Sequence, residues 1–75
     1  MNKLPVVSGK EAVNKFKKIG YLVTRQKGSH VRLVPTGNNP VQKSFTIPLH
    51  KTLKPGLLSQ LIKDAGITVK EFISL

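Results

Sequence analysis

The segment YLVTRQKGSHVRLVPTGNNPVQKSFTI, residues 21–47, decides the fold of this 75-residue chain. It opens with residues 21–26, a run rich in β-branched and aromatic side chains, which are typical of strands. Residues 27–28 and residues 36–40 carry turn signals, the second of them a cluster of threonine, glycine, asparagine and proline. The extended runs on either side of each turn, the last being residues 41–47, therefore predict an antiparallel meander of three strands.

The second and third runs also indicate which side chains face the core. In the second run, which ends at Pro35, the apolar Val31 and Leu33 alternate with the polar His30 and Arg32. Because successive side chains of a strand point to opposite faces, His30 and Arg32 are expected to face away from the core. The third run divides in the same way into Val41, Phe45 and Ile47 on one face and Gln42, Ser44 and Thr46 on the other.

Helical signals flank this segment on both sides. Residues 8–11 have the S-x-x-E form of a capping box, and Gly20 stands where a left-handed helix end is expected. A second helix is predicted from Pro55, which suits a first helical position, to Gly66, and residues 68–71 form another capping box. The apolar residues at helical spacing in the two main helices are Ala12, Val13, Phe16, Ile19, Leu57, Leu58, Leu61, Ile62 and Ala65.

The order of elements is thus α-β-β-β-α with a short C-terminal helical turn. This order predicts an α+β fold with a three-stranded antiparallel sheet, in one domain that spans residues 1–75.

Composition restricts the chemistry. The chain has 13 Lys and Arg, 3 Asp and Glu, a net charge of +10 and no cysteine. This argues against two-metal hydrolysis, paired-carboxylate glycosidases and zinc–thiolate sites, and we expect neither a metal nor a cofactor. Glu11 and Glu71 are assigned to the capping boxes and Asp64 to a helix surface, so no acidic residue is left for catalysis. The strong positive charge predicts a polyanionic partner.

His30 is the main candidate for catalysis. Histidine is the usual general acid or base, and cations stabilise charge that develops on phosphate. RNA carries its own nucleophile, the 2′-hydroxyl, so its cleavage requires proton transfer and charge neutralisation but no metal ion. The alternative is a structural histidine that hydrogen-bonds a neighbour on the strand. The neighbouring candidates for phosphate binding are Arg25, Lys27, Gly28, Ser29 and Arg32.

His50 is the second histidine, and it precedes Lys51 and Lys54 just before the second helix. A helix N-terminus attracts anions, so these three residues are candidates for RNA or phosphate binding. The alternative for His50 is loop packing or capping, and the sequence leaves open whether His50 and His30 share a site. Tyr21 is the only aromatic residue left as a candidate for an exposed position, which disfavours base stacking on an aromatic platform.

No stretch has the composition of a secretion signal or a membrane span, so a cytoplasmic location without membrane association is expected.

Several segments together resemble the HicA family, the toxins of HicAB toxin–antitoxin systems. The most specific of them is RQKGSH at residues 25–30, and the similarity extends over nearly the whole chain. The other matching segments are LPVVSGKE at 4–11, FKKIGY at 16–21, TIPLH at 46–50, LKPGLL at 53–58 and IKDAGI at 62–67. One departure is Pro55, since many relatives have lysine or another polar residue there.

The resemblance implies a fold like that of double-stranded RNA-binding domains and metal-independent cleavage of mRNA. It implies that His30 is the catalytic residue and that a HicB-type antitoxin with an acidic surface inhibits the protein. It implies no definite role for His50. The sequence therefore predicts an endoribonuclease toxin. The alternatives are a non-catalytic double-stranded RNA-binding module and an interaction protein whose basic surface mainly binds an acidic antitoxin.

Overall fold

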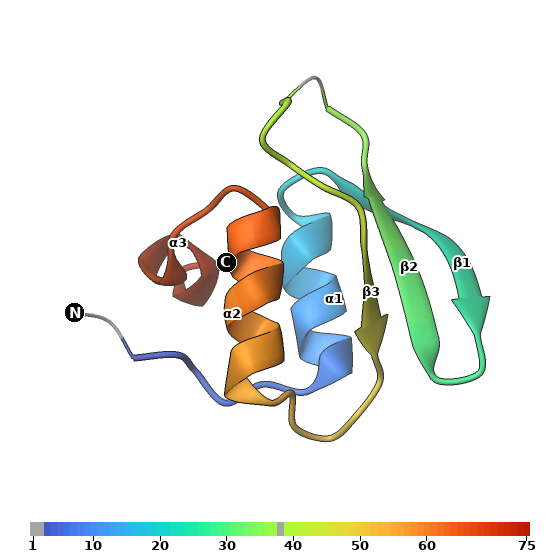
Figure 1. The fold of residues 1–75 in the computed structure, drawn as a ribbon, viewed down its shortest axis with the longest axis horizontal. Coiled ribbons are helices and arrows are strands. Elements are labelled where there is room, and N and C mark those ends of the chain that lie inside the picture. The colour runs from blue at the N-terminus through green and yellow to red at the C-terminus, as the bar shows by residue number, and fades with distance from the viewer. Residues whose placement is uncertain (1–2, 38) are drawn as a thin grey trace.

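The computed structural model describes residues 3–37 and 39–75, and within them it contains three helices and three strands (Figure 1). The predicted turn at residues 36–40 includes Asn38, which lies outside the described residues. The predicted order of elements and the α+β class are confirmed. The elements are α1 (Gly9–Lys17), β1 (Tyr21–Lys27), β2 (His30–Pro35), β3 (Phe45–Pro48), α2 (Pro55–Asp64) and α3 (Val69–Ile73).

Both predicted capping boxes are present. The Ser8 hydroxyl accepts a hydrogen bond from the Glu11 backbone N–H at 3.0 Å, and the Glu11 carboxylate accepts one from the Ser8 N–H at 3.2 Å. The corresponding distances between Thr68 and Glu71 are 3.1 and 3.0 Å. These two carboxylates satisfy backbone donors that a helix start otherwise leaves without partners.

Helix α2 also follows its prediction. Pro55 is its first residue, Leu58, Leu61 and Ile62 are buried, and Gly66 has a φ of 73° just beyond the helix end. None of the helices in the described part of the chain has the length and apolar composition needed to cross a membrane.

The sheet has the order β1-β2-β3, and both pairs are antiparallel. Helices α1 and α2 lie against one of its faces, and the opposite face carries no other described element (Figure 1). Val31 and Leu33 of β2 and Phe45 and Ile47 of β3 are buried under the helices, as predicted. The first turn consists of residues 28–29, one residue later than predicted, because β1 continues through Lys27.

The prediction that the third strand starts at Val41 is wrong, since β3 begins at Phe45. The last pair of the β2–β3 ladder is Leu33 and Phe45. The ladder ends there because Pro35, two residues farther along β2, has no N–H to donate to β3. The preceding residues bond elsewhere: the Val41 N–H donates to the Asn39 side chain at 3.0 Å, and the Lys43 N–H donates to the main-chain oxygen of Asp64 at 2.8 Å.

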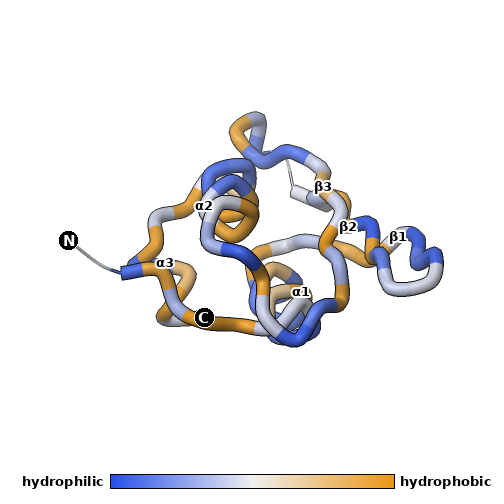
Figure 2. Tube along the Cα trace, turned by 60° about the horizontal axis from the view of Figure 1, so that its bottom comes forward, coloured by the Kyte–Doolittle hydropathy of each residue, from blue (hydrophilic) through white to orange (hydrophobic). Residues whose placement is uncertain are grey.

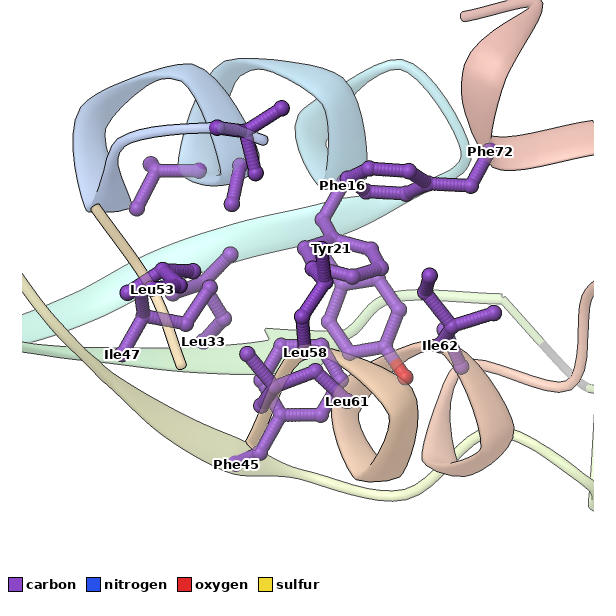
Figure 3. Packing of buried hydrophobic residues seen from close by; sticks show 14 of the residues in the cluster. Phe16, Tyr21, Leu33, Phe45, Ile47, Leu53, Leu58, Leu61, Ile62 and Phe72 are labelled. Carbon is purple, nitrogen blue, oxygen red and sulfur yellow. The ribbon is translucent and has the colours of Figure 1, made fainter. Parts of the chain in front are cut away.

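The core lies between the helices and the sheet, with Phe16 and Phe72 fully buried and Tyr21 only 3% exposed (Figure 3). Tyr21 is therefore not the exposed aromatic residue considered from the sequence. Its ring stacks on Phe45 with a centroid distance of 4.6 Å, and its hydroxyl donates to the Lys43 main-chain oxygen at 2.7 Å. Burial of the phenol, followed by the nearby Asp64 carboxylate, raises the pKa of Tyr21 to about 12.

Candidate active site

The open face of the sheet carries the candidate catalytic residue. His30 and Arg32 point to this face because Val31 and Leu33, which alternate with them, are buried on the other. The hairpin of β1 and β2 extends beyond the helices, and Figure 2 shows hydrophilic segments, in blue, beside the pale turn at its tip. From residue 24 onward both faces of β1 are exposed. His30, the first residue after the turn, thus lies near the tip of a projecting hairpin that is accessible to a large ligand.

A β-bulge in β1 brings two more cations to this face. Val23 pairs with Leu33, but Arg25 pairs with Arg32, so Thr24 is an extra residue without a partner on β2. Regular alternation from Tyr21 would point Arg25 toward the helices. The extra residue reverses the alternation, and since cross-strand partners share a face, Arg25 lies beside Arg32 on the open side.

Lys27 reaches the same side through the same shift, because it is the cross-strand partner of His30. The result is a rectangle of basic residues on two adjacent strands, with Arg25 opposite Arg32 and Lys27 opposite His30. Like charges directly opposite one another destabilise a sheet. The arrangement therefore lowers the stability of the fold, and it favours the binding of an anion.

These residues line an open pocket of about 320 Å³. No carboxylate lines it, so an anionic ligand would meet cations and one imidazole ring without local repulsion. Elsewhere too, the described residues contain no group of three or more His, Asp or Glu side chains placed to hold a metal ion. The pocket residues are Arg25, Lys27, His30, Arg32 and Thr46.

The turn at Gly28 and Ser29 supports the pocket but does not line it. Gly28 has a φ of 58°, which the first position of a two-residue hairpin turn requires and which glycine adopts without strain. The Ser29 main-chain oxygen accepts a hydrogen bond from the Leu49 N–H at 2.6 Å. The two predicted binding residues of the turn therefore fix where β2 starts, and hence the position of His30.

His50, Lys51 and Lys54 lie outside the pocket, although all three are exposed. The His50 main-chain oxygen accepts a hydrogen bond from the Gly9 N–H at 2.9 Å, at the start of α1. Lys54 is the N-cap residue of α2 and provides no side-chain cap. On the question left open by the sequence, the pocket contains His30 and not His50.

Thr46 is the pocket residue that was not predicted as part of a site. It lies on β3 directly opposite Arg32 and is exposed on the open face. The alternation of the third run had placed Thr46 on the polar face, so a signal was present. That signal gained significance only when the strand order placed β3 beside β2.

Comparison with known proteins provides an identification. The sequence model of a family described as the HicA toxin of bacterial toxin–antitoxin systems matches residues 9–67. The matched range runs from the start of α1 to the residue after Gly66 and includes the whole pocket. No match was found among curated protein sequences.

Proposed function

Because the chain belongs to the HicA toxin family of bacterial toxin–antitoxin systems, we propose that it is an mRNA-cleaving endoribonuclease that uses His30 and needs no metal ion. The observation that carries the proposal is the pocket, in which one histidine lies among two arginines and one lysine with no carboxylate. Histidine can transfer protons near neutral pH, and the cations can stabilise a phosphate whose charge increases during reaction.

The proposed reaction proceeds by attack of the ribose 2′-oxygen on the adjacent phosphorus. The 2′-hydroxyl loses its proton, the new P–O2′ bond forms, and the P–O5′ bond breaks as the 5′-oxygen takes up a proton. The products are a 2′,3′-cyclic phosphate and a 5′-hydroxyl end. His30 acts as base at the 2′-hydroxyl or as acid at the leaving oxygen, and since the pocket is open, water exchanges the other proton.

The remaining predicted residues have binding roles in this proposal. Arg25, Lys27 and Arg32 hold and neutralise the phosphate at the reacting centre. Gly28 and Ser29 allow the RNA backbone to approach the hairpin turn closely. The space beside Gly28 is open, since no protein atom lies within 4 Å of where a Cβ atom would be. His50, Lys51 and Lys54 contact the RNA outside the pocket through its phosphates.

The test is cleavage of a single-stranded RNA in EDTA by wild-type protein and by His30→Ala. General acid–base catalysis contributes about 100-fold or more, so the variant should be at least 100-fold slower. It should melt at the same temperature, because the His30 side chain is exposed. His50→Ala should weaken RNA binding without abolishing cleavage. Undiminished cleavage by His30→Ala would contradict the catalytic assignment, and loss of wild-type cleavage in EDTA would contradict the metal-free mechanism.

Membership of a toxin family implies a cognate antitoxin. We propose a HicB-type antitoxin whose acidic surface covers the open face of the sheet, because this face presents Arg25, Lys27 and Arg32 without local acidic residues. Binding of such an antitoxin should stop cleavage and should weaken as salt is raised. If the antitoxin binds with equal affinity to wild type and to a variant lacking these three cations, it covers another surface.

A second function remains a candidate because the order α-β-β-β-α is also that of double-stranded RNA-binding domains. A non-catalytic module of this kind should bind duplex RNA in a salt-dependent way without turnover. Its affinity should not change in His30→Ala. Growth arrest on expression of the chain would favour the toxin.

A further inference from the structure

Thr46 differs chemically from the other residues of the pocket. Arginine and lysine side chains only donate hydrogen bonds, whereas a threonine hydroxyl both donates and accepts. Three of the five lining residues are arginine or lysine, so His30 and Thr46 are the side chains there that can accept a hydrogen bond. The Thr46 hydroxyl makes no hydrogen bond to any of the described residues, while those of Thr36 and Thr68 are used within the fold.

The groups that RNA presents match this division. Phosphate oxygens accept hydrogen bonds, and the arginine and lysine side chains of the pocket can satisfy them. A ribose 2′-hydroxyl has a proton to donate, which these cations cannot receive. Where His30 is engaged in proton transfer, Thr46 is the remaining side chain of the pocket that can accept this hydrogen bond.

The register places Thr46 suitably for a sugar. Thr46 is the partner of Arg32, and His30 is the partner of Pro48, so Thr46 and His30 are diagonal neighbours on adjacent strands. Diagonal neighbours lie about 7 Å apart, which leaves room for a ribose ring between the two side chains. A phosphate attached to that ribose would then lie over Arg32 and Arg25, which face each other across β1 and β2.

We propose that Thr46 accepts a hydrogen bond from a ribose 2′-hydroxyl and thereby makes this pocket bind RNA in preference to DNA. The inference rests on the proposed function in one respect, since it assumes that RNA binds in this pocket. It adds a specificity-determining residue that acts in binding and can be measured without turnover.

The experiment compares the binding of a short single-stranded RNA and of a DNA with the same bases, uracil included, by fluorescence anisotropy. His30→Ala serves as the background so that the RNA is not cleaved. Thr46→Val removes the hydroxyl and keeps the β-branched shape, and Thr46→Ser keeps the hydroxyl. Ser59→Ala removes an exposed hydroxyl from α2, on the other side of the molecule, and is the control.

Thr46→Val should lower RNA affinity about 3- to 10-fold, the usual effect of one hydrogen bond, and leave DNA affinity unchanged. Thr46→Ser and Ser59→Ala should keep the RNA preference of the background protein. Equal loss of RNA and DNA affinity in Thr46→Val, or an unchanged ratio, would overturn the inference.

Failure of the proposed function has a different signature. It would show as absence of RNA cleavage by the protein with His30 intact, in a separate assay. The ratio of RNA to DNA affinity would still decide whether Thr46 recognises the sugar.

Discussion

Replacing Gly9 with alanine should destabilise the protein strongly, because the start of α1 is packed directly against the chain after β3. A Cβ atom at Gly9 would lie 2.1 Å from the Pro48 main-chain oxygen and 2.9 Å from the Leu49 Cα. Both are backbone atoms, so no side-chain rotation can relieve the contact. Real Cβ atoms are essentially never closer than 3.0 Å to another heavy atom, so the backbone around Pro48 or Gly9 would have to move by about 0.9 Å.

The size of the effect follows from two contributions. Inserting a methyl group into a packed site costs about 1–3 kcal/mol. The movement also stretches the 2.9 Å hydrogen bond from the Gly9 N–H to the His50 oxygen, which contributes about 1 kcal/mol. We expect the free energy of unfolding to fall by about 2–4 kcal/mol. For a domain of this size, that corresponds to a decrease in Tm of roughly 10–25 °C.

Gly56→Ala is the matched control, since Gly56 also lies in the first turn of a helix, α2, but has open space around it. There the same substitution should stabilise the protein by about 0.4–1 kcal/mol, because alanine loses less conformational entropy than glycine. Urea unfolding followed by circular dichroism measures both variants. If Gly9→Ala lies within about 0.5 kcal/mol of wild type, or stabilises as Gly56→Ala does, the close approach is not a constraint on this fold.

Three further outcomes are expected. Because the pKa of Tyr21 is raised to about 12, the contribution of its neutral phenol to stability should be complete below pH 10 and be lost as the pH rises toward 12. Tyr21 is the only tyrosine, so phenolate absorbance of the folded and the urea-unfolded protein measures the shift directly, and equal titration midpoints in the two states would refute it. Lys15→Met should destabilise the protein by about 1–2 kcal/mol and expose α3 to hydrogen exchange, because the Lys15 ammonium donates to the main-chain oxygen of Leu75 at 2.8 Å. The control variant Lys17→Met, on the exposed side of α1, should leave the amides of α3 protected. Arg25→Gln should reduce the dependence of log affinity for single-stranded RNA on log salt by about 0.7, and Lys10→Gln should not; identical slopes for both variants would show that Arg25 contacts no phosphate.

Much of this fold can be predicted because its signals are local. The capping boxes depend on residues three positions apart, and the alternation in β2 depends on residues two positions apart. His30 and Arg32 could be assigned to the exposed face for the same reason. Residues close together in the sequence are thus sufficient to predict where the helices start and which side chains of β2 face the site.

The rest depends on contacts that are distant in the sequence. The end of the β2–β3 ladder reflects Pro35 on the partner strand, and the burial of Tyr21 reflects Phe16, Phe45 and α2 around it. Thr46 became a pocket residue only through pairing with Arg32. The bulge at Thr24 has no sequence signal of its own, because threonine is as suitable for a regular strand as for a bulge.

The bulge ties the number of residues in β1 to the face of the sheet on which Arg25 and Lys27 lie. Without the bulge, a strand of the same length would keep the alternation that starts at Tyr21 and would turn Arg25 and Lys27 toward the helices, although no pocket residue would have been changed. Deleting Thr24 would instead remove the bulge and leave both cations on the open face by regular alternation. An ungapped alignment with a relative that lacks the extra residue, counted from the end of α1, would equate residues on opposite faces of the sheet. Relatives should therefore be compared by counting back from the glycine of the hairpin turn, Gly28, and not forward from the end of α1.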